Sequence, residues 1–343
     1  MGWWVDLIMV NRIIPLLLFF CTINAQIALP TFQGVHKVHS SSSALYSFTS
    51  HTFTNSGATL REGPTLAQCH SEYSPSWTDT TDYFTMNNNN GIQIWTVPAT
   101  GQYTIEAWGA SSGVGNSNWG PGGFAGLGVK YTGTFTLEQG NKLSIVVGQQ
   151  GAGASYGCMG GGGSFVALGA DYTTATPLLV AGGGGGSGTY QTSKHANQDA
   201  TYSNTGQSSS DGIAGGSGGN YGGYDTDLPH YMAQPGGGFY TRAPSTDAPY
   251  TGDPGYAFRQ IPYGGEGRNG SIYSEGGFGG GGGGNIDSGG GGGYSGGAGH
   301  GSSSSNGAWN TGGSGGGGSY NSGTNIIQGG TNEGQGKVII TKL

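Results

Sequence analysis

Short apolar segments recur along this chain and are rich in the β-branched and aromatic residues that favour β-strands. They lie at residues 143–147 (LSIVV), 164–168 (SFVAL), 177–181 (PLLVA) and 337–341 (KVIIT). Runs of this length between turn residues predict buried strands. No segment of about ten residues shows the spacing of an amphipathic helix. The pattern therefore predicts an all-β fold.

Other segments in the first half of the chain alternate between apolar and polar residues, as half-buried strands do. Residues 46–53 (YSFTSHTF) show this alternation. Residues 92–97 and 102–108 flank the turn sequence Pro-Ala-Thr-Gly, which predicts a β-hairpin. Residues 129–137 and 143–147 predict a second hairpin-like pair.

Glycine runs separate these apolar segments, and the densest run spans residues 276–293. Others lie at 160–163, 182–186, 215–223, 236–238 and 312–318. Glycine-rich sequence is typical of flexible linkers, but linkers do not carry repeated buried-strand signals. We instead expect extended three-residue-per-turn helices packed side by side, because backbones without Cβ atoms can approach closely. Their N–H and C=O groups would bond to neighbouring helices, at about 1 kcal/mol net each.

The order of the segments predicts a sandwich with an insertion. We assign the β-sandwich to about residues 45–181 and 337–343, and the bundle of polyglycine-II helices to residues 182–336. The Ser-rich residues 26–44 read as a linker before this domain. Inside the sandwich, Thr65 as N-cap predicts one short helix over residues 65–73.

The N-terminus reads as a secretory signal peptide over residues 1–25. Arg12 supplies a positive charge, residues 13–22 (IIPLLLFFCT) form an apolar core, and Ile23-Asn24-Ala25 fits a cleavage site before Gln26. A short membrane anchor is the alternative, although the apolar run is short for a span. We expect a secreted, extracellular protein that has no membrane span after cleavage.

Composition narrows the function classes. Glycine accounts for 77 of the 343 residues, charged residues make up 8%, and the formal net charge is −7. Phosphate binding needs a basic face, so nucleic acid is excluded as a partner. After loss of Cys21 with the signal, Cys69 and Cys158 remain, and whether they pair is open. Asn269 lies in the one N-glycosylation sequon.

Several non-glycine blocks occur in a fixed order between the runs. They include GPT at 63–65 with AQC at 67–69, GIQIWTVPATGQYTI at 91–105, LSIVVGQQG at 143–151, PLLVAGGGG at 177–185 and GQGKVII at 334–340. Together with the glycine runs, this order resembles the glycine-rich extracellular region of the anaplastic lymphoma kinase and leukocyte tyrosine kinase receptor family. The resemblance covers about residues 45–343.

The resemblance implies a tumour-necrosis-factor-like β-sandwich, a jelly roll, with inserted polyglycine-II helices. In the receptors this region helps to bind small protein ligands. The growth-factor-like module, membrane span and kinase that follow it there are absent before the chain stops at Leu343, so we expect a stand-alone secreted form without receptor signalling. The receptors also carry a cysteine where this chain has Ser56, which implies that Cys69 lacks a nearby disulfide partner.

Enzyme motifs are poorly represented. The chain has no phosphate-binding G-x-x-x-x-G-K-[ST], no H-E-x-x-H and no C-x-x-C sequence. Asp225, Asp227 and Asp253 have the chemistry of a Ca²⁺ site, but a solvated loop is the simpler interpretation. We expect no enzyme activity, no cofactor and no metal site.

Tyrosines gather in residues 221–273, mixed with Asp, Pro and Gly. This mixture is typical of recognition loops, because tyrosine offers large amphipathic contacts at low entropic cost. The alternative is that the rings cover the edges of the glycine helices. The candidate binding residues are Tyr221, Tyr224, Tyr231, Tyr240, Tyr256 and Tyr263.

The expected function is that of a non-enzymatic binding or adhesion module. It would recognise an extracellular protein or a cell-surface glycan through loops at the end of the polyglycine lattice. The alternative is a self-assembling structural protein of an extracellular matrix, coat or filament, with self-association through exposed backbone at lattice edges.

Overall fold

The computed structural model describes most of the chain from residue 43 onward. The described residues are 43–87, 91–115, 124–154, 157–188, 191, 193–225, 233–245, 251–268, 271–284, 288–301 and 312–343. The predicted signal peptide, most of the predicted linker, Tyr231 and Asn269 lie outside them. Residues 42–343 group as one unit.

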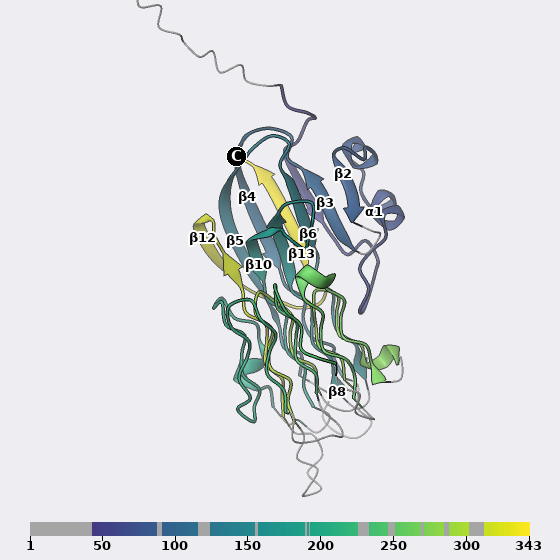
Figure 1. The fold of residues 1–343 in the computed structure, drawn as a ribbon, viewed down its shortest axis with the longest axis vertical. Coiled ribbons are helices and arrows are strands. Elements are labelled where there is room, and N and C mark those ends of the chain that lie inside the picture. Colours follow the sequence, from purple (N-terminus) through teal and green to yellow (C-terminus); the bar gives the residue numbers. More distant parts are fainter. Residues whose placement is uncertain are drawn as a thin grey trace, which may run out of the picture. The chain divides into compact units, whose positions relative to one another are not determined.

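Two antiparallel sheets form the upper part of this unit in Figure 1. Sheet A has the strand order β1-β13-β4-β5-β12, and sheet B has the order β11-β10-β9-β6-β3-β2. All paired strands in both sheets are antiparallel. The all-β prediction is thereby confirmed, whereas the jelly-roll topology stays a prediction.

The elements have the following bounds. Sheet A contains β1 (Ser50–Phe53), β4 (Gly101–Trp108), β5 (Gly128–Leu137), β12 (Thr324–Asn332) and β13 (Lys337–Lys342). Sheet B contains β2 (Phe84–Asn87), β3 (Ile92–Thr96), β6 (Lys142–Val146), β9 (Ser164–Leu168), β10 (Thr176–Ala181) and β11 (Tyr320–Asn321). A separate two-stranded sheet joins β7 (Gly153–Ala154) to β8 (Gly157–Cys158). The helices are α1 (Leu66–Glu72), η1 (Ser76–Asp79), η2 (Ala196–Gln198), η3 (Phe258–Gln260) and η5 (Ile272–Ser274).

The main hydrophobic core lies between the two sheets. In β4, Tyr103, Ile105 and Ala107 alternate with partly exposed residues and are fully buried. Trp95 of sheet B meets Tyr103 of sheet A edge to face, with ring centroids 6.0 Å apart. The period-2 pattern along β4 therefore places one face of sheet A on this core.

A second core covers the outer face of sheet B. Phe239, Phe258 and Phe278 come from the glycine-rich region and are fully buried against strands of this sheet. Phe258 stacks on Phe239 at 4.6 Å and contacts Phe165 of β9 at 5.3 Å. This cover explains why β3 is buried at every position rather than at every second one.

The glycine runs lie beside one another as extended segments below the sheets in Figure 1. They bond to each other through the backbone, as from Gly183 N–H to Gly292 O (2.8 Å) and from Gly291 N–H to Gly315 O (2.9 Å). A Cβ on Gly291 would lie 2.1 Å from Gly183 O. The absence of a side chain is therefore a condition for this contact.

Both predicted hairpins are wrong. β3 and β4 lie in different sheets, and so do β5 and β6; β4 pairs with β5, and β3 pairs with β6. The two turns are instead arches between the sheets. They bond to each other, since Val97 N–H donates to Asn141 O and Gly140 N–H donates to Val97 O. A strand that is apolar on both faces, as β3 is, needs a covered sheet and not an isolated hairpin.

Other expectations differ in their outcomes. The short helix is confirmed as α1, with Thr65 and Gln68 forming a capping box. Residues 320–332, which we assigned to the glycine insertion, form β11 and β12 and extend both sheets. β12 is exposed at all but its last position, so it lacks the alternation that reveals a strand in sequence. Among the described residues, no helix is long and apolar enough to span a bilayer.

Candidate binding surface

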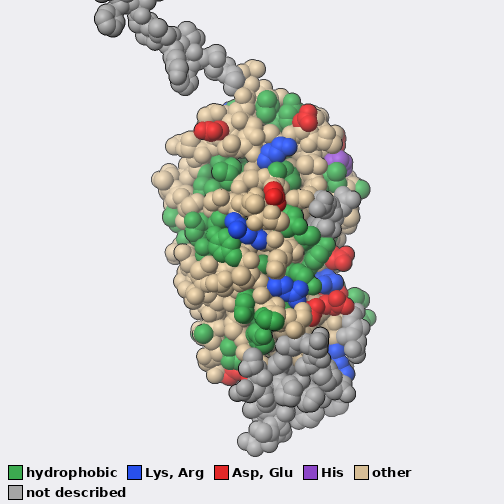
Figure 2. Space-filling model, viewed as in Figure 1, with side chains coloured by type: hydrophobic (Ala, Val, Ile, Leu, Met, Phe, Trp, Pro, Cys, Tyr) green, Lys and Arg blue, Asp and Glu red, His purple; other side chains and the backbone are tan. Residues whose placement is uncertain are grey.

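The predicted binding tyrosines are half-buried rather than projecting into solvent. This holds for Tyr221, Tyr224, Tyr240, Tyr256 and Tyr263, and Tyr231 lies outside the described residues. On the face shown in Figure 2, basic and acidic side chains lie side by side next to hydrophobic ones. The charged side chains that contact the tyrosines are therefore part of the candidate surface.

Tyr256 and Tyr263 form one group with two arginines. The Arg242 guanidinium carbon lies 3.6 Å from the Tyr256 ring centroid, and the two tyrosine rings meet at 6.0 Å. Arg61 lies 5.8 Å from the Tyr263 centroid and 3.6 Å from Glu266 Oε2. We call Arg61, Arg242, Tyr256, Tyr263 and Glu266 the Tyr–Arg surface.

Backbone contacts hold this surface on the glycine layers. Tyr256 N–H donates to Tyr263 O at 3.0 Å, which joins the two tyrosine segments. A Cβ on Gly237 would lie 2.2 Å from Tyr256 O, and one on Gly280 would lie 2.7 Å from the same atom. Tyr256 is therefore positioned by two glycine segments that approach it from the interior.

The charges on the surface are partly compensated. Burial raises the pKa of Tyr263 above its ordinary value, Glu62 adds to this rise, and Arg61 opposes it. Arg242 Nη2 donates to Ser245 Oγ at 2.6 Å, while its Nε has no hydrogen-bond partner. Arg242 thus combines a contact with the Tyr256 ring and a hydrogen bond from its guanidinium group.

Tyr240 belongs instead to the core that covers sheet B. Its ring packs against Phe239 (5.0 Å) and Tyr294 (6.2 Å), and Arg259 lies over it at 4.8 Å. Arg259 also donates to Ala175 O. For Tyr240, the structure places the ring in packing contacts rather than at the Tyr–Arg surface. Tyr221 and Tyr224 also lie outside that surface as defined.

Both described cysteines are free and buried. Ser56 Oγ donates to Cys69 Sγ at 3.5 Å, and Ser187 Oγ donates to Cys158 Sγ at 3.4 Å. Burial raises the pKa of Cys69 to about 11, so this thiol stays protonated at neutral pH. A Cys69–Cys158 disulfide is absent.

No group of three or more His, Cys, Asp or Glu side chains is placed to hold a metal ion within the part of the chain that the structure describes. Asp227, which we grouped with Asp225 and Asp253, lies outside that part.

Sequence reasoning found the two tyrosines of this surface but missed its arginines. Arg61 lies far from Tyr263 in the chain, and nothing in its local sequence points to that contact. The only signal was the scarcity of charge in the whole chain, since 8% of the residues are charged. In a chain with so few charges, an arginine beside an aromatic segment is a candidate binding residue.

No protein-family model matches this chain. Over 109 residues the chain is 38% identical to the leukocyte tyrosine kinase receptor of Mus musculus. The match covers 32% of this chain and 12% of the receptor, so the chain spans only a small part of that relative. The similarity supports a relationship to that receptor over the matched stretch.

Proposed function

We propose that this chain is an extracellular, non-enzymatic binding module that recognises a protein or a cell-surface glycan. The signal-like N-terminus supports secretion. The similarity to a receptor over 109 residues supports a receptor-like role. The proposed contact region is the Tyr–Arg surface.

The observation that carries this proposal is the 3.6 Å stacking of Arg242 on Tyr256. Rings and guanidinium groups held in place lose little entropy when they bind a partner. Tyrosine and arginine are also the residue types that contribute most to binding energy at interfaces. A surface built from fixed Tyr and Arg side chains therefore suits recognition of a protein loop or a hydroxyl-rich glycan.

We also propose the architecture below this surface. The extended glycine segments are polyglycine-II helices, and the two sheets are a tumour-necrosis-factor-like jelly roll. Direct backbone bonds between runs, such as Gly317 N–H to Gly183 O at 2.8 Å, support the helix bundle. The position of β13 between β1 and β4 supports an insertion within one sandwich.

A double variant tests the binding role. Tyr256→Ala with Arg242→Ala is expected to weaken binding to a panel of cell-surface proteins and glycans by roughly tenfold or more, which corresponds to the loss of one strong contact pair. The matched control is Tyr273→Ala, because Tyr273 is 70% exposed and lies outside the Tyr–Arg surface. Unchanged binding in a double variant that is still folded would contradict the proposal.

A self-assembling structural protein is the second candidate, and β12 favours it. This edge strand has no charged residue and no proline, and Ile326 and Ile327 are 50% and 58% exposed. Uncharged open edges favour pairing between molecules. Asn325 and Gly330 have positive φ angles, which interrupts the ladder and leaves a short edge for such pairing. Size-exclusion chromatography across a dilution series tests this: a persistent monomer removes the candidate.

A further inference from the structure

β1 is an edge strand whose outer side is open. Among the strands that the structure describes, it pairs with β13 alone, and Lys342 N–H donates to Thr49 O at 2.9 Å. Bonded residues alternate along an antiparallel strand, so His51 and Phe53 also bond toward β13. The N–H and C=O groups of Ser50 and Thr52 consequently point away from the sheet.

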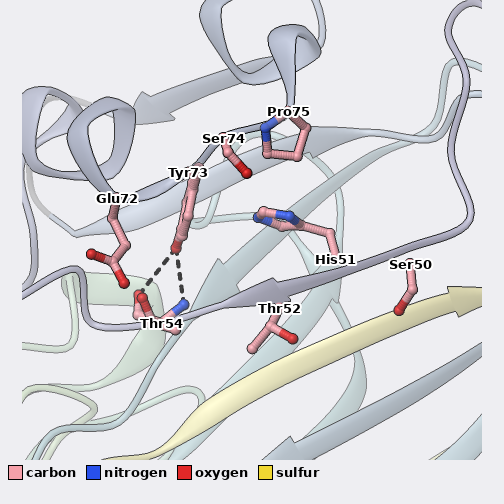
Figure 3. Close-up of a pocket in the computed structure, with 8 residues that line it drawn as sticks. All are labelled: Ser50, His51, Thr52, Thr54, Glu72, Tyr73, Ser74 and Pro75. Carbon is pink, nitrogen blue, oxygen red and sulfur yellow. Dashed lines mark hydrogen bonds between the residues drawn. The ribbon is translucent and has the colours of Figure 1, made fainter.

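A slot runs along this open edge. It has a volume of about 470 Å³ and separates β1 from the segment that leaves α1. Figure 3 shows β1 on one side and the Glu72–Pro75 side chains on the other, with His51 between them. The Tyr73 hydroxyl accepts from Thr54 N–H (2.9 Å) and bonds to Thr54 O (3.2 Å), which closes one end.

His51 gives the slot a rigid and uncharged floor. Its ring meets those of Phe53, Tyr73 and Trp77 at 4.6, 4.7 and 5.0 Å. The side chain is 9% exposed, and its Nε2 has no hydrogen-bond partner. Burial lowers the pKa of His51 to about 4, so the imidazole is neutral at physiological pH. The charge at the slot therefore comes from Glu72.

Glu72 fixes the electrostatic character of the slot. No basic group among the described residues forms an ion pair with this carboxylate. It lies at the end of α1 and lines the slot together with Ser50, Thr52 and Ser74. An occupant would therefore be favoured if it offered backbone donors and acceptors to β1 and a positive charge to Glu72.

We propose that this slot binds an extended segment of a partner protein, which adds to sheet A as an extra strand and places a basic side chain beside Glu72. Tyr73 and Pro75 line the side of the slot that faces β1. The β1 strand of a second copy (Ser-His-Thr-Phe) has no Lys or Arg to place beside Glu72, so a partner segment with a basic side chain suits the slot better. The proposal is independent of the Tyr–Arg surface.

The test separates backbone pairing from side-chain contact. A display library of random linear peptides is selected on the full chain, and selected peptides are measured against Thr52→Pro and Thr52→Ala. Proline removes an N–H that makes no bond to β13, so the sheet is retained, but the added strand loses its partner. We expect binding to fall by about tenfold or more in Thr52→Pro and to stay within about twofold in Thr52→Ala.

Two further measurements complete the test. Glu72→Gln should weaken peptides that carry Lys or Arg and leave neutral ones unchanged. Amide hydrogen exchange at Ser50 and Thr52 should be fast in the free chain and slow in the complex, which also decides the case if Thr52→Pro fails to fold. Three outcomes would each overturn the proposal. The first is that no peptide is selected, and the second is that peptides bind folded Thr52→Pro as well as the wild type. The third is slow exchange at both amides in the free chain, because a segment of the chain itself would then fill the slot.

Discussion

The Ser56 hydroxyl donates to the Cys69 thiol at 3.5 Å inside a buried corner of the sandwich. Cys69 is fully buried on α1, and its N–H bonds to Thr65 O. The resemblance described in the sequence analysis implies a cysteine at the position of Ser56. The corner therefore brings the two side chains together but holds only one sulfur atom.

Ser56→Cys is expected to form a disulfide with Cys69 under oxidising conditions. The bridge would close a loop between residues 13 apart in sequence, and loops of that size give about 3 kcal/mol of stabilisation. Thiol titration and thermal unfolding with and without reductant measure the effect. Ser56→Ala is the control, because it removes the hydroxyl without adding sulfur. A fully reduced Ser56→Cys protein under oxidising conditions would show that the corner cannot reach disulfide geometry.

Two glycines with the same backbone angle separate conformational strain from close packing. Gly280 and Gly140 both have a φ of +82°, but a Cβ would lie 2.7 Å from Tyr256 O at Gly280 and would meet nothing within 4 Å at Gly140. Gly140→Ala should lower the free energy of unfolding by about 1 kcal/mol, through left-handed backbone strain alone. At Gly280 the same substitution should cost roughly 1–3 kcal/mol more, because a backbone segment has to move. Denaturant unfolding of both variants measures the difference, and equal losses would refute the packing account.

Protonation of His51 should lower the free energy of unfolding as the pH falls. Its pKa is about 4 in the folded protein and 6.5 when unperturbed, so the unfolded chain binds the proton more readily between these values. The contribution is fully present above pH 6.5, is lost progressively toward pH 4 and amounts to at most about 3 kcal/mol. Unfolding free energies across this range measure it.

The matched variant for this prediction is His51→Phe, which keeps an aromatic ring among Phe53, Tyr73 and Trp77. Burial also lowers the pKa of His300, so some pH dependence remains in the variant. The expected result is a shallower dependence between pH 4 and 6.5 than in the wild type. Identical curves would mean that His51 titrates as in the unfolded chain.

Amide exchange distinguishes a bonded glycine bundle from a loose tail. The N–H groups of Gly183, Gly291 and Gly317 donate to carbonyls of other glycine segments and should exchange slowly. Ser50 N–H, which faces away from β13, is the internal reference for fast exchange. Rapid exchange at all three glycines would remove the basis for treating the runs as a folded layer.

Strand positions could be read from the sequence, but strand partners could not. The apolar segments at 143–147, 164–168 and 177–181 became β6, β9 and β10 with end points shifted by no more than one residue. The hairpins failed because a four-residue turn joins two strands equally well within a sheet or between sheets. Which arrangement forms depends on what covers the strand. The cover over β3 and β9 comes from Phe239, Phe258 and Phe278, far along the chain.

The candidate surface was also only partly predictable, because residues distant in sequence complete it. Tyr256 and Tyr263 stand out because tyrosine is abundant in their segment, whereas Arg61 reaches Tyr263 from the sandwich half of the chain. Tyr240 has the same local composition but packs into the core beside Phe239. Local sequence indicates which rings are available, and the long-range fold decides which of them remain near solvent.

The close contacts between glycine backbones restrict how this protein can diverge. A Cβ at Gly183, Gly291 or Gly315 would overlap a carbonyl oxygen of another segment, at 2.4, 2.1 and 1.9 Å respectively. Each such position is therefore closed to the other nineteen amino acids. Lineages that inherit this domain are therefore expected to keep these glycines almost invariant and to accumulate their differences at positions where a side chain meets no neighbouring backbone.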